Sequence, residues 1–170
     1  MKKSFFSILV LVLLLSISSF GQTKFTINAG LQLPTGDMKT GLNSGYGGRL
    51  TVDFSLPLLP VSLAFSAGYD RWGIKSTSEN AYMIPVMAGA RFYTGGIYVG
   101  ADLGFAYSNS SFAGSTSSTN FALSPIIGYR LSLTPVGLVA LDLNVRYWNV
   151  STPGSSSNWI GLNAGVALGL

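Results

Sequence analysis

The chain has 170 residues, of which 48% are hydrophobic and only 9% are charged, and it contains neither cysteine nor histidine. This length fits one domain, and so few charges cannot cover a soluble surface, since soluble domains carry about 25% charged residues. The lack of cysteine excludes disulfides and thiolate metal sites, and the net charge of +4, without a Lys/Arg cluster, excludes a nucleic-acid partner.

The first 21 residues have the layout of a cleavable signal peptide. Two lysines precede an apolar run that ends near Leu15, and small residues stand three and one positions before Gln22. The alternative is a membrane-anchor helix, but the run is shorter than the roughly 20 apolar residues that span a bilayer. We therefore expect residues 1–21 to be removed and residues 22–170 to form the mature domain outside the cytoplasm.

Eight segments of the mature chain alternate apolar with small or polar residues, the period of two that is typical of β-strands. In chain order they are residues 25–33, 47–56, 61–72, 81–93, 97–107, 120–131, 139–148 and 159–170. The connections after the second, fourth and sixth segments are short, whereas the other four, among them residues 149–157, are longer and rich in Gly, Ser, Thr and Asn. This alternation predicts an all-β fold, an eight-stranded antiparallel up-and-down transmembrane barrel with four extracellular loops.

The two faces of these strands differ in a way that favours a membrane barrel over a soluble ligand-binding one. The apolar face carries too many Leu, Ile, Val, Phe and Tyr side chains for the interior of an eight-stranded barrel. The other face is mostly Gly, Ala, Ser, Thr and Asn, and no Lys or Glu lies in the middle of a strand. Aromatic residues lie towards both strand ends, as in an interfacial girdle: Phe25, Phe54, Phe92 and Tyr129 at one end, and Tyr69, Tyr82, Tyr107 and Tyr147 at the other.

Two prolines, Pro85 and Pro125, fall within predicted strands, where each removes a ladder hydrogen bond. We expect a bulge, or a strand end that protrudes above the membrane, at each of them.

Eight charged residues share the inward register of their strands, four of each sign. They are Arg49, Asp53, Asp70, Arg91, Asp102, Arg130, Asp142 and Arg146. Arginine binds carboxylates bidentately and stays charged when buried, which favours a salt-bridged plug that closes the lumen. The alternative is a polar conduit or ligand site lined by fixed charges. Asp142 is the central case, since Arg130 and Arg146 lie on the preceding and the same strand.

Arg71 is the one strand charge whose register points towards lipid, near the loop end of its strand. It is either an ordinary rim residue or a contact for the phosphates of lipopolysaccharide.

Three stretches, LPTGD (33–37), IPVMAGARFY (84–93) and YVGADLGFAY (98–107), resemble the outer-membrane β-barrel domain family of Gram-negative bacteria, which is similar to the small OmpX and OmpW barrels. The resemblance implies a place in the bacterial outer membrane, contact with its lipids and lipopolysaccharide, and recognition by the barrel assembly machinery. Such barrels often end in an aromatic residue that this machinery reads, whereas this chain ends in Leu170. We expect a monomer with an extracellular ligand of unknown identity.

Catalysis has little support in the sequence. Without histidine a Ser-His pair cannot be built, each inward Asp has an Arg as its expected partner, and no Glu lies on a strand. Asp37 and Glu79 are single carboxylates in separate loops and do not form a calcium site. We therefore expect no enzyme, no cofactor and no metal. The predicted function is a structural or surface-interaction role with a closed lumen, and the alternative is a narrow OmpW-like channel for small solutes.

Overall fold

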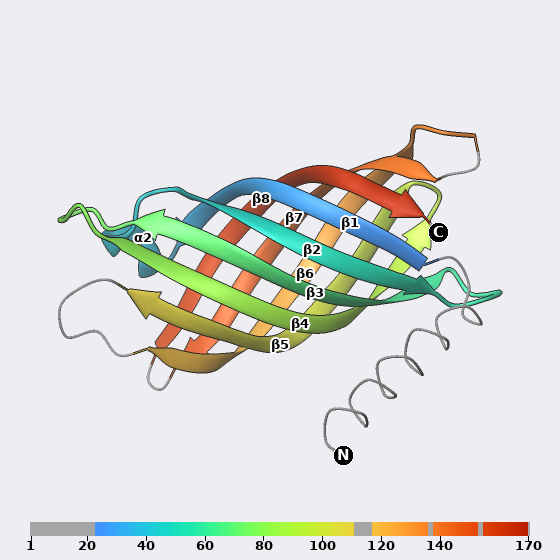
Figure 1. The fold of residues 1–170 in the computed structure, drawn as a ribbon. Helices are drawn as coiled ribbons and strands as arrows, with labels where there is room; N and C mark the ends of the chain where they lie inside the picture. Colours follow the sequence, from blue (N-terminus) through green and yellow to red (C-terminus); the bar gives the residue numbers. More distant parts are fainter. Residues whose placement is uncertain (1–22, 111–116, 136–137, 153–154, 170) are drawn as a thin grey trace, which may run out of the picture.

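The structure, a computed structural model, describes residues 23–110, 117–135, 138–152 and 155–169. Its elements are β1 (Thr23–Thr35), α2 (Met38–Gly41), β2 (Gly45–Ser55), β3 (Val61–Gly73), β4 (Asn80–Thr94), β5 (Ile97–Ser110), β6 (Ser118–Ser132), β7 (Val139–Thr152) and β8 (Ser155–Gly169). Each strand pairs with the next along the chain and β8 pairs with β1, so the sheet closes into a barrel (Figure 1). The predicted eight-stranded antiparallel barrel is confirmed.

The predicted signal peptide lies outside the described residues and stays a prediction. Within the described ranges, no helix is both long and apolar enough to cross a membrane.

The barrel has two distinct ends. The connections from β2 to β3, β4 to β5 and β6 to β7 lie at one end, which we call the turn end. The other connections lie at the opposite end, the loop end, where α2 is found; β8 finishes at the turn end (Figure 1).

The strands are longer than the ten or so residues that span a bilayer, since they contain 11 to 15 residues. The prediction of a loop over residues 149–157 is therefore wrong for most of that stretch, because β7 continues to Thr152 and β8 begins at Ser155. Polar side chains pair across this hairpin, and Asn149 Nδ2 donates to Asn158 Oδ1 at 2.7 Å. Such cross-strand pairs stabilise the sheet at this end.

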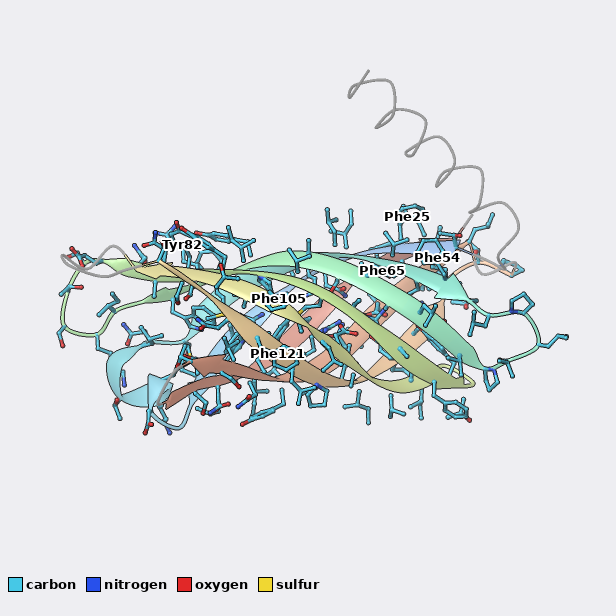
Figure 2. The ribbon with its side chains drawn as sticks, turned by 90° about the horizontal axis from the view of Figure 1, so that it is seen from below. Phe25, Phe54, Phe65, Tyr82, Phe105 and Phe121 are labelled. Atoms are coloured by element: carbon cyan, nitrogen blue, oxygen red, sulfur yellow. The ribbon has the colours of Figure 1, made fainter. Side chains whose placement is uncertain are left out.

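The outer face of the barrel is apolar over most of its length. Ile27 and Phe105 are 61% exposed, and Leu50 is 60% exposed. Phe25 and Phe54 lie near the turn end and Tyr82 near the loop end (Figure 2). A soluble monomer rarely exposes so large an apolar surface, whereas the hydrocarbon of a membrane would cover it. A closed barrel suits a membrane because it has no strand edge with unpaired backbone N–H and C=O groups. A hollow of about 760 Å³ lies on this outer face between residues such as Leu31 and Leu143.

The two strand prolines are accommodated without a bulge. Pairing between β3 and β4 stops beside Pro85 and resumes in the same register, from Ala67↔Val86 to Asp70↔Met83. Pairing between β6 and β7 is likewise interrupted beside Pro125 and keeps its register from Leu123↔Asn149 to Ile126↔Arg146. Each proline therefore interrupts the ladder on one side only, because it lacks the N–H donor that the neighbouring strand would need.

Candidate functional site

The lumen holds all eight charged residues that the inward register predicts. Each of them is buried, and none is more than 8% exposed. Six of them alternate in sign along one line of ion pairs, in the order Asp142, Arg130, Asp53, Arg91, Asp102 and Arg146. We call these six residues the charge network. The remaining two, Arg49 and Asp70, form a separate pair at 3.2 Å.

The charge network joins opposite walls of the barrel. Asp53 on β2 lies 3.0 Å from Arg130 on β6 and also pairs with Arg91 on β4. Asp102 on β5 lies 2.5 Å from Arg146 on β7 and 3.5 Å from Arg91. The contact between Asp53 and Arg130 crosses the lumen, since β2 and β6 lie opposite each other in the closed barrel, whereas the other contacts join neighbouring strands or strands two apart.

The sequence suggests Arg130 and Arg146 as ion-pair partners of Asp142, and the structure pairs Asp142 with only the first of these two. Asp142 pairs with Arg130 at 3.0 Å, whereas Arg146 pairs with Asp102. Four positions along one strand separate Asp142 from Arg146 by about 13 Å at a rise of about 3.3 Å per residue. Arg146 on β7 therefore finds a closer carboxylate on β5, two strands away, than along its own strand.

Asp142 receives a complete shell of donors. Arg130 Nε donates to its carboxylate at 3.0 Å, the Tyr98 hydroxyl at 3.0 Å, Asn28 Nδ2 at 3.1 Å and Asn144 Nδ2 at 2.8 Å. A buried charge is tolerable when hydrogen bonds of this kind replace its water.

Inward glycines make room for these side chains. A Cβ at Gly128 would lie 2.3 Å from Cζ of Tyr98, and a Cβ at Gly47 would lie 2.0 Å from Oδ1 of Asp70. The absence of a side chain on one strand thus gives space to a large or charged one on the next strand.

A line of amide side chains connects Asp142 with the loop half of the lumen. Trp159 Nε1 donates to Gln32 Oε1 at 3.1 Å, and Gln32 Nε2 donates to Asn163 Oδ1 at 3.1 Å. Asn163 Nδ2 then donates to Asn144 Oδ1 at 3.0 Å, and Asn144 in turn donates to Asp142. Because β8, β1 and β7 supply these residues, the line runs along one wall of the barrel.

The loop half of the lumen contains an aromatic cluster that the sequence prediction missed. Trp72, Trp148 and Trp159 are at most 1% exposed. Trp148 stacks on Trp159 with centroids 5.1 Å apart, and Trp72 meets Trp159 edge-on at the same distance. Met83 packs in this cluster, and Met38 of α2 packs against it. The alternation of side chains along the strands could have predicted this cluster. Trp72 lies two residues after Asp70, and Trp148 two residues after Arg146, so both tryptophans point inward like these charged residues.

Buried side chains crowd the middle of the lumen. The space bordered by Arg91, Tyr98, Arg130 and Asp142 has no room for a water molecule. Pockets of about 240 Å³ and 200 Å³ remain at the turn end and the loop end, respectively. Within the described residues, no cluster of acidic side chains could hold a metal ion.

Two further basic residues lie at the rims. Arg71 is half-buried on the outer face, where its Nη1 donates to the Tyr46 hydroxyl at 3.3 Å. Lys24 lies at the turn end and points inward, on the same face of β1 as Thr26 and Asn28. The sequence prediction did not include it among the inward charges.

Comparisons with known proteins agree with this architecture. The family model described as "Outer membrane protein beta-barrel domain" matches residues 7–168. The structure is similar to that of Neisserial surface protein A, with 22% identity, a TM-score of 0.64, and coverage of 87% of this chain and 98% of that one. It is also similar to the attachment invasion locus protein Ail of Yersinia pestis, with 17% identity, a TM-score of 0.60, and coverage of 88% and 99%.

A third similar structure is the outer membrane protein AlkL in lipid bilayers, with 18% identity, a TM-score of 0.56, and coverage of 89% of this chain and 90% of that one. A search of curated protein sequences found no match. At 17–22% identity, the similarity to these solved structures shows a shared fold. The match to the family model spans nearly the whole chain. The predicted family and localisation are therefore confirmed: the chain belongs to the outer membrane protein beta-barrel domain family and is a protein of the bacterial outer membrane.

Proposed function

We propose that this barrel has a closed lumen and a structural or surface-interaction role in the outer membrane. The observation that supports this proposal best is the occluded middle of the lumen, where Arg130 and its neighbours leave no room for water. In this proposal the lumen side chains stabilise the barrel, and the connections at the loop end are presented to the exterior.

The cost of opening the lumen supports the same proposal. A solute path through the middle requires Arg130 to leave Asp53 and Asp142. Separating buried charged partners is strongly unfavourable, because it leaves a buried charge without compensation. Removal of one partner from a buried ion pair typically costs about 3 to 5 kcal/mol of stability. The alternative, a narrow channel for small solutes, would need several of these pairs to separate together.

Conductance in a planar lipid bilayer tests the closed lumen. We expect no stable open channel from protein whose folded barrel is first verified by its heat-dependent mobility in gel electrophoresis. This verification separates a closed barrel from an unfolded sample. Well-resolved, solute-selective single-channel steps from the verified protein would replace the closed-lumen proposal with the channel.

We further propose that Arg71 contacts the phosphates of lipopolysaccharide. Its half-buried position on the outer face near the loop end, beside the Tyr46 hydroxyl, supports this role. Arginine is well suited to phosphate because its planar fork donates two parallel hydrogen bonds.

We also propose that the protein has no enzymatic activity. Each of the four lumen aspartates is paired with at least one arginine, which holds the carboxylates in ion pairs.

A further inference from the structure

The hollow of about 760 Å³ on the outer face is a groove that runs obliquely across five neighbouring strands, from β5 to β1 by way of β6, β7 and β8 (Figure 1). Two rows of outward side chains form its banks. Register partners on successive strands make up the turn-side row: Ile97, Tyr129, Leu143, Ala164 and Ala29. The loop-side row lies two residues nearer the loop end: Ile127, Val145, Leu162 and Leu31. The backbone between the two rows is the floor of the groove.

The groove is apolar along its length. Ala29 and Ala164 leave the turn-side row low where it reaches β1 and β8, beside neighbours as large as Leu31, which is 56% exposed. Of the described residues that line the groove, none is charged. Asn144 and Asn163 belong to its floor, but their amides face the lumen, where Asn163 Nδ2 donates to Asn144 Oδ1 at 3.0 Å. The side chains that the groove offers to a ligand are therefore mainly hydrocarbon.

The groove begins at the turn end and rises towards the middle of the barrel. Ile97 is the first residue of β5, whereas Ala29 lies six residues after the start of β1 at Thr23, and both strands start at the turn end. Four inter-strand spacings of about 4.8 Å make the groove about 19 Å long. With strands tilted by about 45°, it rises by about 13 Å, close to one leaflet of a hydrocarbon core about 30 Å thick. The groove therefore has the length and slope to hold one acyl chain within one leaflet.

Tyr129 stands where the groove opens at the turn end. Its ring packs beside Gly96, where a Cβ would lie 2.7 Å from Cε2 of the tyrosine. Tyr129 is 45% exposed, and within the described residues its hydroxyl has no hydrogen-bond partner. Tyrosines at this level of a membrane protein place the ring against hydrocarbon and the hydroxyl among headgroups. The hydroxyl can therefore donate to a phosphate or ester oxygen of a lipid.

We infer that this groove binds one acyl chain of a phospholipid, with the headgroup beside Tyr129. The short turns of such barrels face the periplasm, and the periplasmic leaflet of an outer membrane consists of phospholipid. The lipid that enters the groove at the turn end is therefore of this class, whereas lipopolysaccharide would enter from the loop end. A second barrel would contact this convex wall along a line parallel to the membrane normal, which is oblique to the groove and leaves most of it empty.

Native mass spectrometry of the barrel in neutral detergent, after incubation with palmitoyl-oleoyl phosphatidylethanolamine, tests this inference. We expect one bound phospholipid per barrel. Ala164→Leu should weaken its binding by about tenfold, because the larger side chain occupies the space of the acyl chain. Tyr129→Phe should weaken it by about threefold, since it removes one hydrogen bond. Ala90→Leu is the matched control, because Ala90 is an exposed alanine of β4 on the opposite wall, and it should leave binding unchanged.

Heat-dependent gel mobility verifies that each variant is folded, and competition with lipid A separates the lipids of the two leaflets. The inference is overturned if the parent binds no phospholipid, if Ala164→Leu binds it as tightly as the parent, if Ala90→Leu binds it as weakly as Ala164→Leu, or if lipid A displaces it. A dimeric mass that Ala164→Leu abolishes would instead assign the groove to a second copy of the chain. None of these results bears on whether the lumen conducts.

Discussion

From the turn end to the middle of the barrel, arginine and aspartate side chains fill the lumen, whereas tryptophan and methionine side chains fill it towards the loop end. The same closed sheet surrounds both regions. In the charged region each side chain depends on a partner of opposite sign from another strand. In the aromatic region the tryptophan rings stack or meet edge-on, and the Arg49 guanidinium lies 4.3 Å from the centre of the Trp148 ring.

The two regions should therefore respond to different kinds of substitution. A buried charge that loses its partner is penalised even when the volume is unchanged. Aromatic packing responds to volume and shape, and to charge where a cation lies over a ring or a polar ring atom has a partner. Trp159 is one residue at which the two regions meet, because its Nε1 begins the amide line that ends at Asp142; Trp148 is another, because Arg49 lies over its ring.

The largest effect is expected from Asp142→Asn, which keeps the volume and removes the charge. The variant should lose about 3 to 5 kcal/mol of unfolding free energy, because Arg130 loses one of its two carboxylate partners in a buried site. Denaturant unfolding in lipid vesicles measures it. Glu79→Gln in the connection between β3 and β4 is the control and should change stability by less than about 0.5 kcal/mol. Near-zero effects for both variants would indicate a lumen filled with water and would favour the channel.

A smaller effect should separate two tryptophans of the aromatic region. Trp159→Phe and Trp72→Phe remove the same atoms from fully buried rings. Of these two indole nitrogens, Trp159 Nε1 has a hydrogen-bond partner, whereas Trp72 Nε1 has none among the described residues. Trp159→Phe leaves Gln32 Oε1 without its donor and should cost about 1 to 3 kcal/mol more than Trp72→Phe. The same unfolding experiment provides the comparison, and equal losses would show that ring packing alone determines stability at both positions.

The sequence predicts the strands and their two faces because both depend on a local period of two. The same parity is enough to direct Asp53 and Arg130 inward, but it does not show that they meet across the lumen. That contact depends on the stagger of the closed sheet and on the reach of arginine. The tryptophan cluster was missed because the many small inward residues dominated the pattern. Helix α2 (Met38–Gly41) is too short to show a helical period.

The smallest change in stability is expected for Arg71→Gln, which alters an arginine on the outer face. Arg71 is half-buried and makes one side-chain hydrogen bond, at 3.3 Å, to the Tyr46 hydroxyl. Its removal should therefore change the unfolding free energy by less than about 1 kcal/mol, as is usual for exposed charged groups.

Binding to lipopolysaccharide should respond to this substitution much more than stability does. We expect Arg71→Gln to weaken binding of lipid A to the barrel in neutral detergent micelles, because a charge-assisted hydrogen bond to phosphate is lost. Arg71→Lys should have an intermediate effect, since it keeps the charge and loses the planar fork. Dephosphorylated lipid A is the control and should bind to the parent and to Arg71→Gln equally. If Arg71→Gln weakens binding to both lipids by the same factor, Arg71 acts through general contact with the membrane surface and the phosphate contact is excluded.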